Sequence, residues 1–219
     1  MITRLPKWIW FGGVVLAFSA GIINSIAFMS FAQQAATHMT GIFTHLSMHI
    51  AQGDSAATMV SLFTLLSFFA GALLSGVIIM DAQLKMGRRY GVALMLECLL
   101  LLASTFAFNE KSIWGQYLAC MAAGLQNAMV STYSGTIVRT THMTGVLTDL
   151  GALAGQWLRG VRVQGLKVKI LGGILLAFFW GGFTGVMLYS RIGYFAMLVP
   201  SAITGLSAIG YLWLRTHQK

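Results

Sequence analysis

The stretch Thr37-His38-Met39-Thr40-Gly41 recurs letter for letter as Thr141-His142-Met143-Thr144-Gly145. The segments before the two copies also match, since Ala20-Gly21 and Asn24 correspond to Ala123-Gly124 and Asn127. Farther on, Phe68-Phe69-Ala70-Gly71 resembles Phe178-Phe179-Trp180-Gly181. Repetition of this kind indicates an internal duplication. The sequence therefore predicts two related halves, residues 1–110 and 111–219, within one domain.

The composition is that of an integral membrane protein. The chain is 57% hydrophobic and 9% charged, with a mean hydropathy of +0.78, which excludes an ordinary soluble domain. Several apolar runs are long enough to cross a hydrocarbon core of ~30 Å at ~1.5 Å per residue. They cover residues 8–31, 57–80, 90–108, 113–132, 170–189 and 192–214. We therefore expect an all-α integral membrane protein with about six transmembrane helices.

The basic residues predict how these helices are oriented. With the N-terminus inside, the inner segments hold 12 of the 14 Lys and Arg residues, all except Lys111 and Arg191. Cytoplasmic loops of membrane proteins carry such an excess, so we expect both termini in the cytoplasm. The net charge of +9 then follows from topology. Because the charges are scattered over several loops, we expect contact with lipid head groups and no nucleic-acid binding.

The repeat and the topology together predict an inverted arrangement. Each half holds three spans, so the first half begins inside and the second begins outside. Such halves are related by a pseudo-two-fold axis in the membrane plane, which is typical of transporters and of some channels. We therefore expect a 3+3 inverted-topology repeat, with the pathway of a small solute at the interface of the repeats. The alternative is a duplicated membrane protein without a transport role.

Each copy of the pentapeptide precedes a stretch that is too short to cross the membrane, residues 42–52 and 146–158. We expect either amphipathic helices in the interface or re-entrant half-helices that dip into the core. Re-entrant helices would point their positive N-terminal ends at each other, which suits an anion or a polar neutral solute.

The threonines and glycines of the repeated motif are expected to shape these helix starts. Thr40 and Thr144 are the expected N-caps, and Gly41 and Gly145 permit close approach of the backbone. The alternative is that these residues only form a turn and cap a surface helix.

Two motifs resemble a known family. One is Ala20-Gly21-x-x-Asn24 leading to Met39-Thr40-Gly41; the other is Gly124-Leu125-Gln126-Asn127 leading to residues 139–145 and then Leu147-Thr148-Asp149-Leu150. They resemble the YoaK family of uncharacterised bacterial membrane proteins, over nearly the whole chain. The resemblance implies a bacterial inner-membrane location and carries no established activity. An Asn usually follows the first Thr-Gly of that family, where this chain has Ile42, which implies an altered first half-site.

Polar residues at membrane depth complete the predicted site. Glu97 lies near the middle of the third span, where an isolated charge costs at least ~2.5 kcal/mol. It is therefore a candidate proton or cation site. The alternative is a protonated Glu97 that forms a hydrogen bond with a neighbouring helix. Asn24 and Asn127 are repeat partners that can face one cavity, or else join helices by hydrogen bonds. The predicted solute-binding residues are Asn24, His38, Thr40, Gly41, Glu97, Gln126, Asn127, His142, Thr144, Gly145 and Asp149.

The histidines allow a second hypothesis. His38, His45 and His49 can share one helical face, and His142 and Asp149 repeat the first spacing, so a transition-metal site is conceivable. No compact metal motif, catalytic triad or nucleotide-binding motif occurs, and we therefore expect no metal, no cofactor and no enzymatic activity. The alternative function is an intramembrane metal-dependent enzyme or a membrane assembly factor. Besides lipid and a small solute, a second copy of the chain is the partner that the sequence leaves open.

Overall fold

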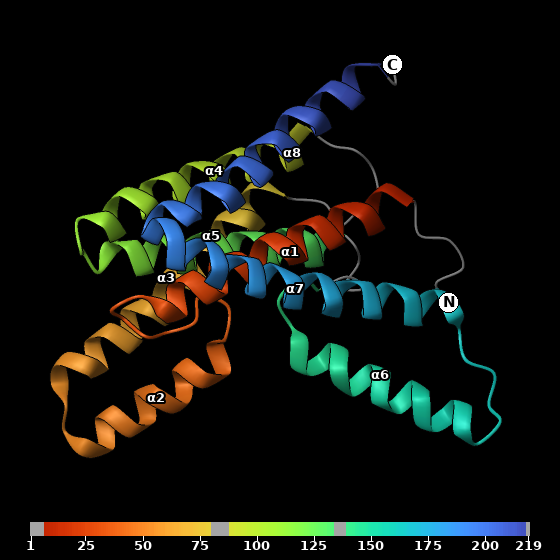
Figure 1. Ribbon diagram of the computed structural model, residues 1–219, viewed down its shortest axis with the longest axis horizontal. Helices are drawn as coiled ribbons and strands as arrows, with labels where there is room; N and C mark the ends of the chain where they lie inside the picture. The colour runs from red at the N-terminus through yellow and green to blue at the C-terminus, as the bar shows by residue number, and fades with distance from the viewer. Residues whose placement is uncertain (1–6, 80–87, 134–138, 218–219) are drawn as a thin grey trace.

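The structure, a computed structural model, describes residues 7–79, 88–133 and 139–217. Within these residues every regular element is helical. The elements are α1 Lys7–Met29, α2 Met39–Gln52, α3 Ser55–Ile78, α4 Arg88–Asn109, α5 Trp114–Tyr133, α6 Met143–Leu158, α7 Gly165–Ile192, η1 Gly193–Met197 and α8 Leu198–His217 (Figure 1). Each predicted span corresponds to a long helix and each predicted short stretch to a short one, so the all-α prediction is confirmed.

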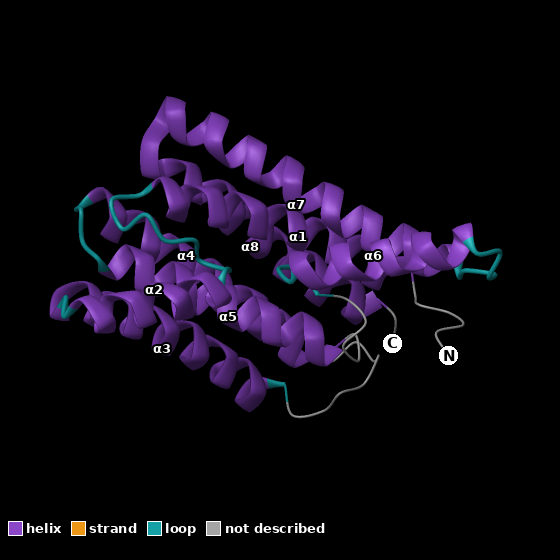
Figure 2. Cartoon of the chain, turned by 90° about the horizontal axis from the view of Figure 1, so that it is seen from below, coloured by secondary structure: helices purple, strands orange, loops and turns teal. Residues whose placement is uncertain are grey.

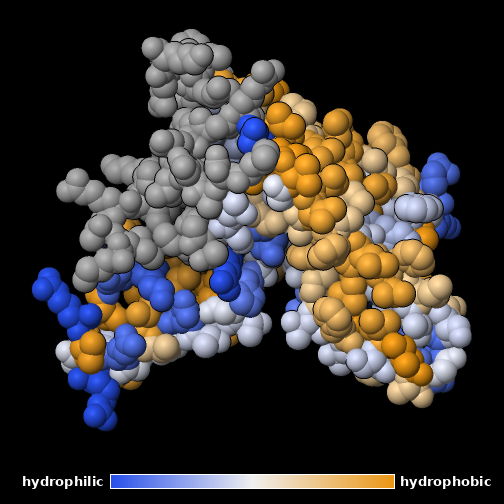
Figure 3. All heavy atoms as spheres, turned by 180° about the vertical axis from the view of Figure 1, so that it is seen from behind, coloured by the Kyte–Doolittle hydropathy of each residue, from blue (hydrophilic) through white to orange (hydrophobic). Residues whose placement is uncertain are grey.

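Four stretches of the described chain are long and apolar enough to cross a membrane, namely residues 10–29, 55–78, 89–109 and 165–213. The last is 49 residues long and covers α7, η1 and most of α8. The helix α5 is not among them, because polar side chains such as Gln116, Gln126 and Asn127 interrupt its apolar sequence. These helices are those of a multi-pass membrane protein. Apolar side chains also cover much of the face shown in Figure 3.

The core lies around α1 and α5. One apolar cluster joins Leu16 of α1 to Leu125 of α5 and Ile174 of α7. A second cluster joins Ile22 of α1 to Ala119 of α5. The helices α1, α4 and α5 contribute buried residues to both clusters, whereas α3 and α7 are more exposed. A helix enclosed by its neighbours can carry polar side chains that bond within the protein, as Gln116 and Gln126 of α5 do.

The closest helix contacts join the two halves of the chain. The helix α1 packs chiefly on α7, and α3 packs chiefly on α5. At each crossing two glycines meet the backbone of the opposite helix so closely that a Cβ would collide with a carbonyl oxygen. The pairs are Gly21 with Phe178, Gly181 with Phe18, Gly71 with Met121 and Gly124 with Phe68. Each glycine of one crossing has its repeat counterpart at the other, so the halves interlock through equivalent contacts.

The two short helices lie apart from this bundle. The helix α2 packs on α3, and α6 packs on α7. Their N-terminal ends lie near the middle of the molecule, and from there α2 and α6 run toward opposite ends (Figure 1). The view from below also shows α2 and α6 toward opposite ends of the molecule (Figure 2). The fold therefore brings the beginnings of the two repeated motifs together and separates the ends of the helices that follow.

Candidate functional site

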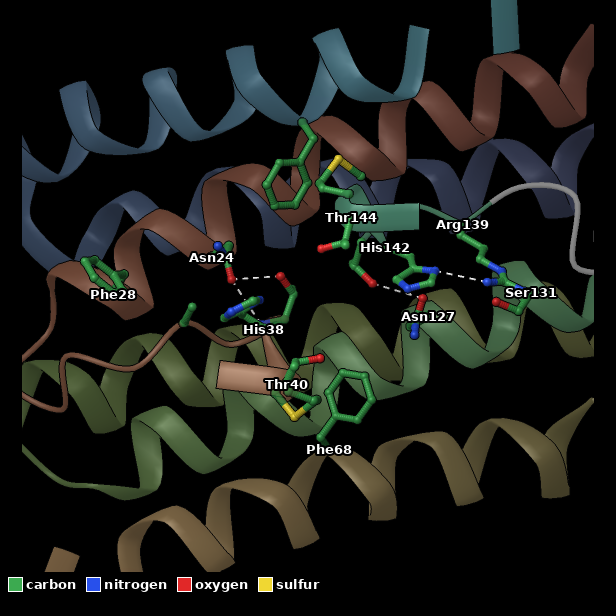
Figure 4. Close-up of a pocket in the computed structure, with 16 residues that line it drawn as sticks. Asn24, Phe28, His38, Thr40, Phe68, Asn127, Ser131, Arg139, His142 and Thr144 are labelled. Carbon is green, nitrogen blue, oxygen red and sulfur yellow. Dashed lines mark hydrogen bonds between the residues drawn. The ribbon is translucent and has the colours of Figure 1, made fainter. Parts of the chain in front are cut away.

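A cavity of about 760 Å³ lies between the N-terminal ends of α2 and α6 (Figure 4). From behind, the space-filling view shows a notch between the two lobes of the molecule (Figure 3). The lining comprises 16 described residues, which form repeat-related pairs at the offsets of the sequence repeat. The identical pairs are Asn24 with Asn127, Thr37 with Thr141, His38 with His142, Met39 with Met143, Thr40 with Thr144 and Phe68 with Phe178. The unlike pairs are Phe28 with Ser131 and Ala35 with Arg139.

An asparagine in each half holds the segment that leads into the short helix. The Oδ1 atom of Asn24 accepts hydrogen bonds from the backbone N–H of Thr37 at 3.0 Å and from its hydroxyl at 2.8 Å. The Oδ1 atom of Asn127 accepts one from the hydroxyl of Thr141 at 3.0 Å. Because a backbone N–H only donates, the atom of Asn24 that it meets is the amide oxygen. The two NH₂ groups have no hydrogen bond to a described residue and remain free to donate to a solute.

The two short helices begin earlier than predicted. Their N-caps are His38 and His142, so the expectation that Thr40 and Thr144 are the N-caps is wrong. The reason is that the carbonyl oxygens of both histidines already accept a helical hydrogen bond, at 3.2 Å in α2 and 3.0 Å in α6. Neither histidine ring caps its own helix. The first N–H groups of both helices therefore lack a side-chain cap, and both threonines line the cavity from the first turn.

Gly41 and Gly145 make room for the histidine rings. A Cβ at Gly41 would collide with the ring of His38, and a Cβ at Gly145 would lie 2.8 Å from Nδ1 of His142. Neither glycine lines the cavity. The structure thus gives both glycines a packing role, because each allows a ring to fold back over the first turn of its helix.

Arg139 supplies a charge to the cavity. Its Nη1 lies 3.0 Å from Nδ1 of His142 (Figure 4). A guanidinium group has only donors, so Nδ1 of His142 accepts, and the ring carries its proton on Nε2. The counterpart of Arg139 in the first half is Ala35, and the two sides of the cavity therefore differ in charge. No carboxylate is among the described residues that line it.

Some predicted site residues lie outside the cavity. Gln126 is fully buried, and its Nε2 donates to the carbonyl oxygen of Leu16 at 2.9 Å and to Oγ1 of Thr140 at 3.2 Å. It therefore joins α5 to α1 and to the segment that precedes α6. Asp149 is exposed and forms an ion pair with Lys167 at 3.3 Å. Seven residues after His142, it is ~10 Å farther along α6.

Glu97 also lies away from the cavity. It is fully buried within α4, and neither of its carboxylate oxygens has a hydrogen-bond partner among the described residues. The structure therefore does not join Glu97 to the paired motifs, and its role in proton or cation transfer stays a prediction.

The cavity contains residues that were not predicted. Six of them carry the repeat signal and could have been found from it: Thr37, Met39, Phe68, Thr141, Met143 and Phe178. Phe28, Ala35, Ser131 and Arg139 carry no such signal, because each differs from its counterpart.

The histidine pattern does not assemble into a cluster of ligands in the described part of the chain. His45 and His49 stack along α2 with ring centroids 6.0 Å apart, while His38 stands at the N-cap. No three His, Cys, Asp or Glu side chains among the described residues come together as ligands of one metal ion would.

Comparison with known proteins identifies a family. The model of a family described as "Protein of unknown function (DUF1275)" matches residues 12–210. The match includes both copies of the pentapeptide and all the residues that line the cavity. No curated protein and no solved structure matches the chain.

Proposed function

This chain belongs to the DUF1275 family, to which YoaK-like proteins belong, and from that premise we propose that it is a transporter or channel for a small solute. The solute would pass through the cavity between α2 and α6. One observation carries the proposal, namely that the 16 lining residues form repeat-related pairs. A solute site shared by two equivalent halves is what inverted-repeat transporters use to face both sides of a membrane in turn.

The proposed topology has six spans, α1, α3, α4, α5, α7 and α8. The stretch of residues 165–213 crosses twice, because its two helices have 28 and 20 residues. The helix α5 crosses inside the bundle, where its polar side chains are shielded from lipid. The excess of Lys and Arg supports cytoplasmic termini in a bacterial inner membrane. The two halves then have opposite orientations.

We further propose that α2 and α6 are re-entrant half-helices. They have 14 and 16 residues, so at ~1.5 Å per residue neither crosses a core of ~30 Å. Their N-terminal ends lie near the middle of the molecule, and their C-terminal ends point to opposite ends (Figure 1). Non-helical backbone at membrane depth needs protein or water beside it, and a polar cavity at both helix starts supplies this.

The experiment that tests the proposal is a double-mutant cycle at the paired threonines. Purified protein is first screened for solutes that raise its Tm, with salts, polyols, amides and amino acids as probes. Thr40→Val and Thr144→Val each keep the approximate shape and remove a hydroxyl that lines the cavity. We expect each change to weaken the response to the solute, and the double change to be non-additive, because residues that share a ligand are energetically coupled.

Thr44→Val and Thr148→Val are the matched controls. These threonines are also repeat partners, but their hydroxyls bond to carbonyl oxygens of their own helices, at 3.1 Å and 2.8 Å. They do not line the cavity, so their loss should leave the response unchanged. The substitutions at all four threonines could instead cause small, additive losses of stability and leave the solute response unchanged. That result would show that the motifs have only a structural role. Stoichiometric metal in the purified protein would favour the enzyme hypothesis.

A further inference from the structure

We infer that the solute of this cavity is a small anion, an inference that rests on the proposed function and specifies its substrate class. The first support is the charge of the lining. Arg139 is a permanent cation that lines the cavity, and no carboxylate lies among the described lining residues. The Arg139 side chain is exposed, so it is accessible to a solute that enters the cavity. Arg139 would repel a cation that enters the cavity, and no carboxylate among the described lining residues would offset this repulsion.

The second support is that the lining offers several hydrogen-bond donors to a solute. The amide oxygen of Asn24 accepts two hydrogen bonds and that of Asn127 accepts one, all from threonines of the paired motifs. The NH₂ groups of both asparagines have no hydrogen bond to a described residue and can donate. The hydroxyls of Thr40 and Thr144 line the cavity, have no hydrogen bond to a described residue and can donate as well as accept. These donors can bind a solute that accepts hydrogen bonds, as an anion does.

The third support comes from the two helix starts. Both α2 and α6 begin at the cavity without a side-chain cap, whereas α3 is capped by Asp54, whose carboxylate accepts from the N–H of Ala57 at 3.0 Å. The uncapped N–H groups and the partial positive charges of the helix ends act in the same direction as Arg139. The volume of about 760 Å³ leaves room for an anion that keeps part of its hydration shell.

The test is a flux measurement on the full chain in liposomes. Swelling is followed by light scattering in iso-osmotic potassium chloride, nitrate or formate, with valinomycin carrying the potassium so that only anion entry limits the rate. Urea and glycerol serve as neutral probes, and empty liposomes give the leak. We expect the protein to accelerate swelling in at least one of the three salts and in neither neutral solute.

Variants of Arg139 connect the flux to the cavity. We expect Arg139→Gln to lower the anion-dependent rate about tenfold or more, because it removes a charge-assisted contact. Arg139→Lys keeps the charge and should retain most of the rate, which guards against a mere folding defect. Arg159→Gln is the matched control: Arg159 is exposed at the far end of α6 and lies outside the cavity, so its loss should leave the rate unchanged.

The outcomes separate this inference from the proposed function. Acceleration by neutral solutes alone would overturn the anion and leave the transport proposal standing. An absence of all flux would contradict the transport proposal. The anion inference would then be tested by comparing the Tm of the protein in nitrate with its Tm in gluconate at constant ionic strength. A shift that is lost in Arg139→Gln would support the anion site, and the absence of any shift would overturn it. Stabilisation by phosphatidylglycerol that depends on Arg139, without a response to the three salts, would assign the cavity to a lipid head group. That outcome would also overturn the small-anion inference.

Discussion

Gly124→Ala is expected to lower the free energy of unfolding by about 3 kcal/mol, measured as thermal unfolding of the purified protein. The added methyl would collide with the carbonyl oxygen of Phe68 and lie 2.8 Å from its carbonyl carbon. Both atoms belong to the backbone of α3, so no side-chain rotation relieves the contact, and α3 and α5 must separate. Gly71→Ala adds a methyl group at the same crossing from α3, where it would collide with the carbonyl oxygen of Met121 in α5. The double variant should lose less than the sum of the two changes, because one separation relieves both contacts.

Gly76→Ala is the control for this prediction. Gly76 lies in α3 as well, but a Cβ there would meet nothing within 4 Å. Its replacement should be neutral or stabilise the protein by up to ~1 kcal/mol, since alanine is the better helix former. If Gly76→Ala and Gly124→Ala had the same Tm, the close crossing of α3 and α5 would be wrong.

Asn24→Leu is expected to have the second large effect. It leaves the backbone N–H and the hydroxyl of Thr37 without their acceptor, which costs about 1–3 kcal/mol for an unsatisfied group. The segment before α2 forms one wall of the cavity, so the response to solute should also be lost. Asn127→Leu removes one hydrogen bond to the corresponding segment and should cost less. Thermal unfolding with and without solute measures both effects.

Asn109→Leu serves as the control for the asparagines. The Nδ2 atom of Asn109 donates to the carbonyl oxygen of Thr105 at 2.8 Å, within α4 and away from the cavity. We expect a smaller loss of stability and an unchanged solute response. Equal losses at Asn24, Asn109 and Asn127, with the solute response intact in all three, would show that the asparagines do not organise the cavity.

The repeat predicted much of the site because equal residues in the two halves meet at one place. Asn24 and Asn127 were expected to face one cavity, and both line it. The helix starts were harder to predict. Threonine is the better N-cap by preference, but the ring of His38 packs over Gly41 and its carbonyl already accepts the first helical hydrogen bond. Such packing depends on three-dimensional contacts that a local motif does not express.

Charged and polar residues at membrane depth were predicted with less success. Hydropathy places Glu97 and Gln126 inside spans, but it does not say which neighbour each side chain meets. Gln126 joins α5 to α1, and Glu97 is enclosed within the bundle. Arg139 was not predicted as a site residue, because it has no identical counterpart in the first half. It lines the cavity although its counterpart is Ala35, so a search for identical pairs could not find the residue that makes the two halves unequal.

The central claim is that the two motifs meet in one cavity although their helices run to opposite ends of the molecule. Cross-linking tests it most directly, with Thr40→Cys and Thr144→Cys in a chain whose Cys98 and Cys120 are replaced by alanine. A short bifunctional maleimide should join these two positions within one chain, as detected by mass spectrometry. The same reagent should not join Gln52→Cys to Leu158→Cys, at the far ends of α2 and α6 (Figure 1). Separate labelling of positions 40 and 144 without a cross-link, or equal cross-linking of both pairs, would contradict the account.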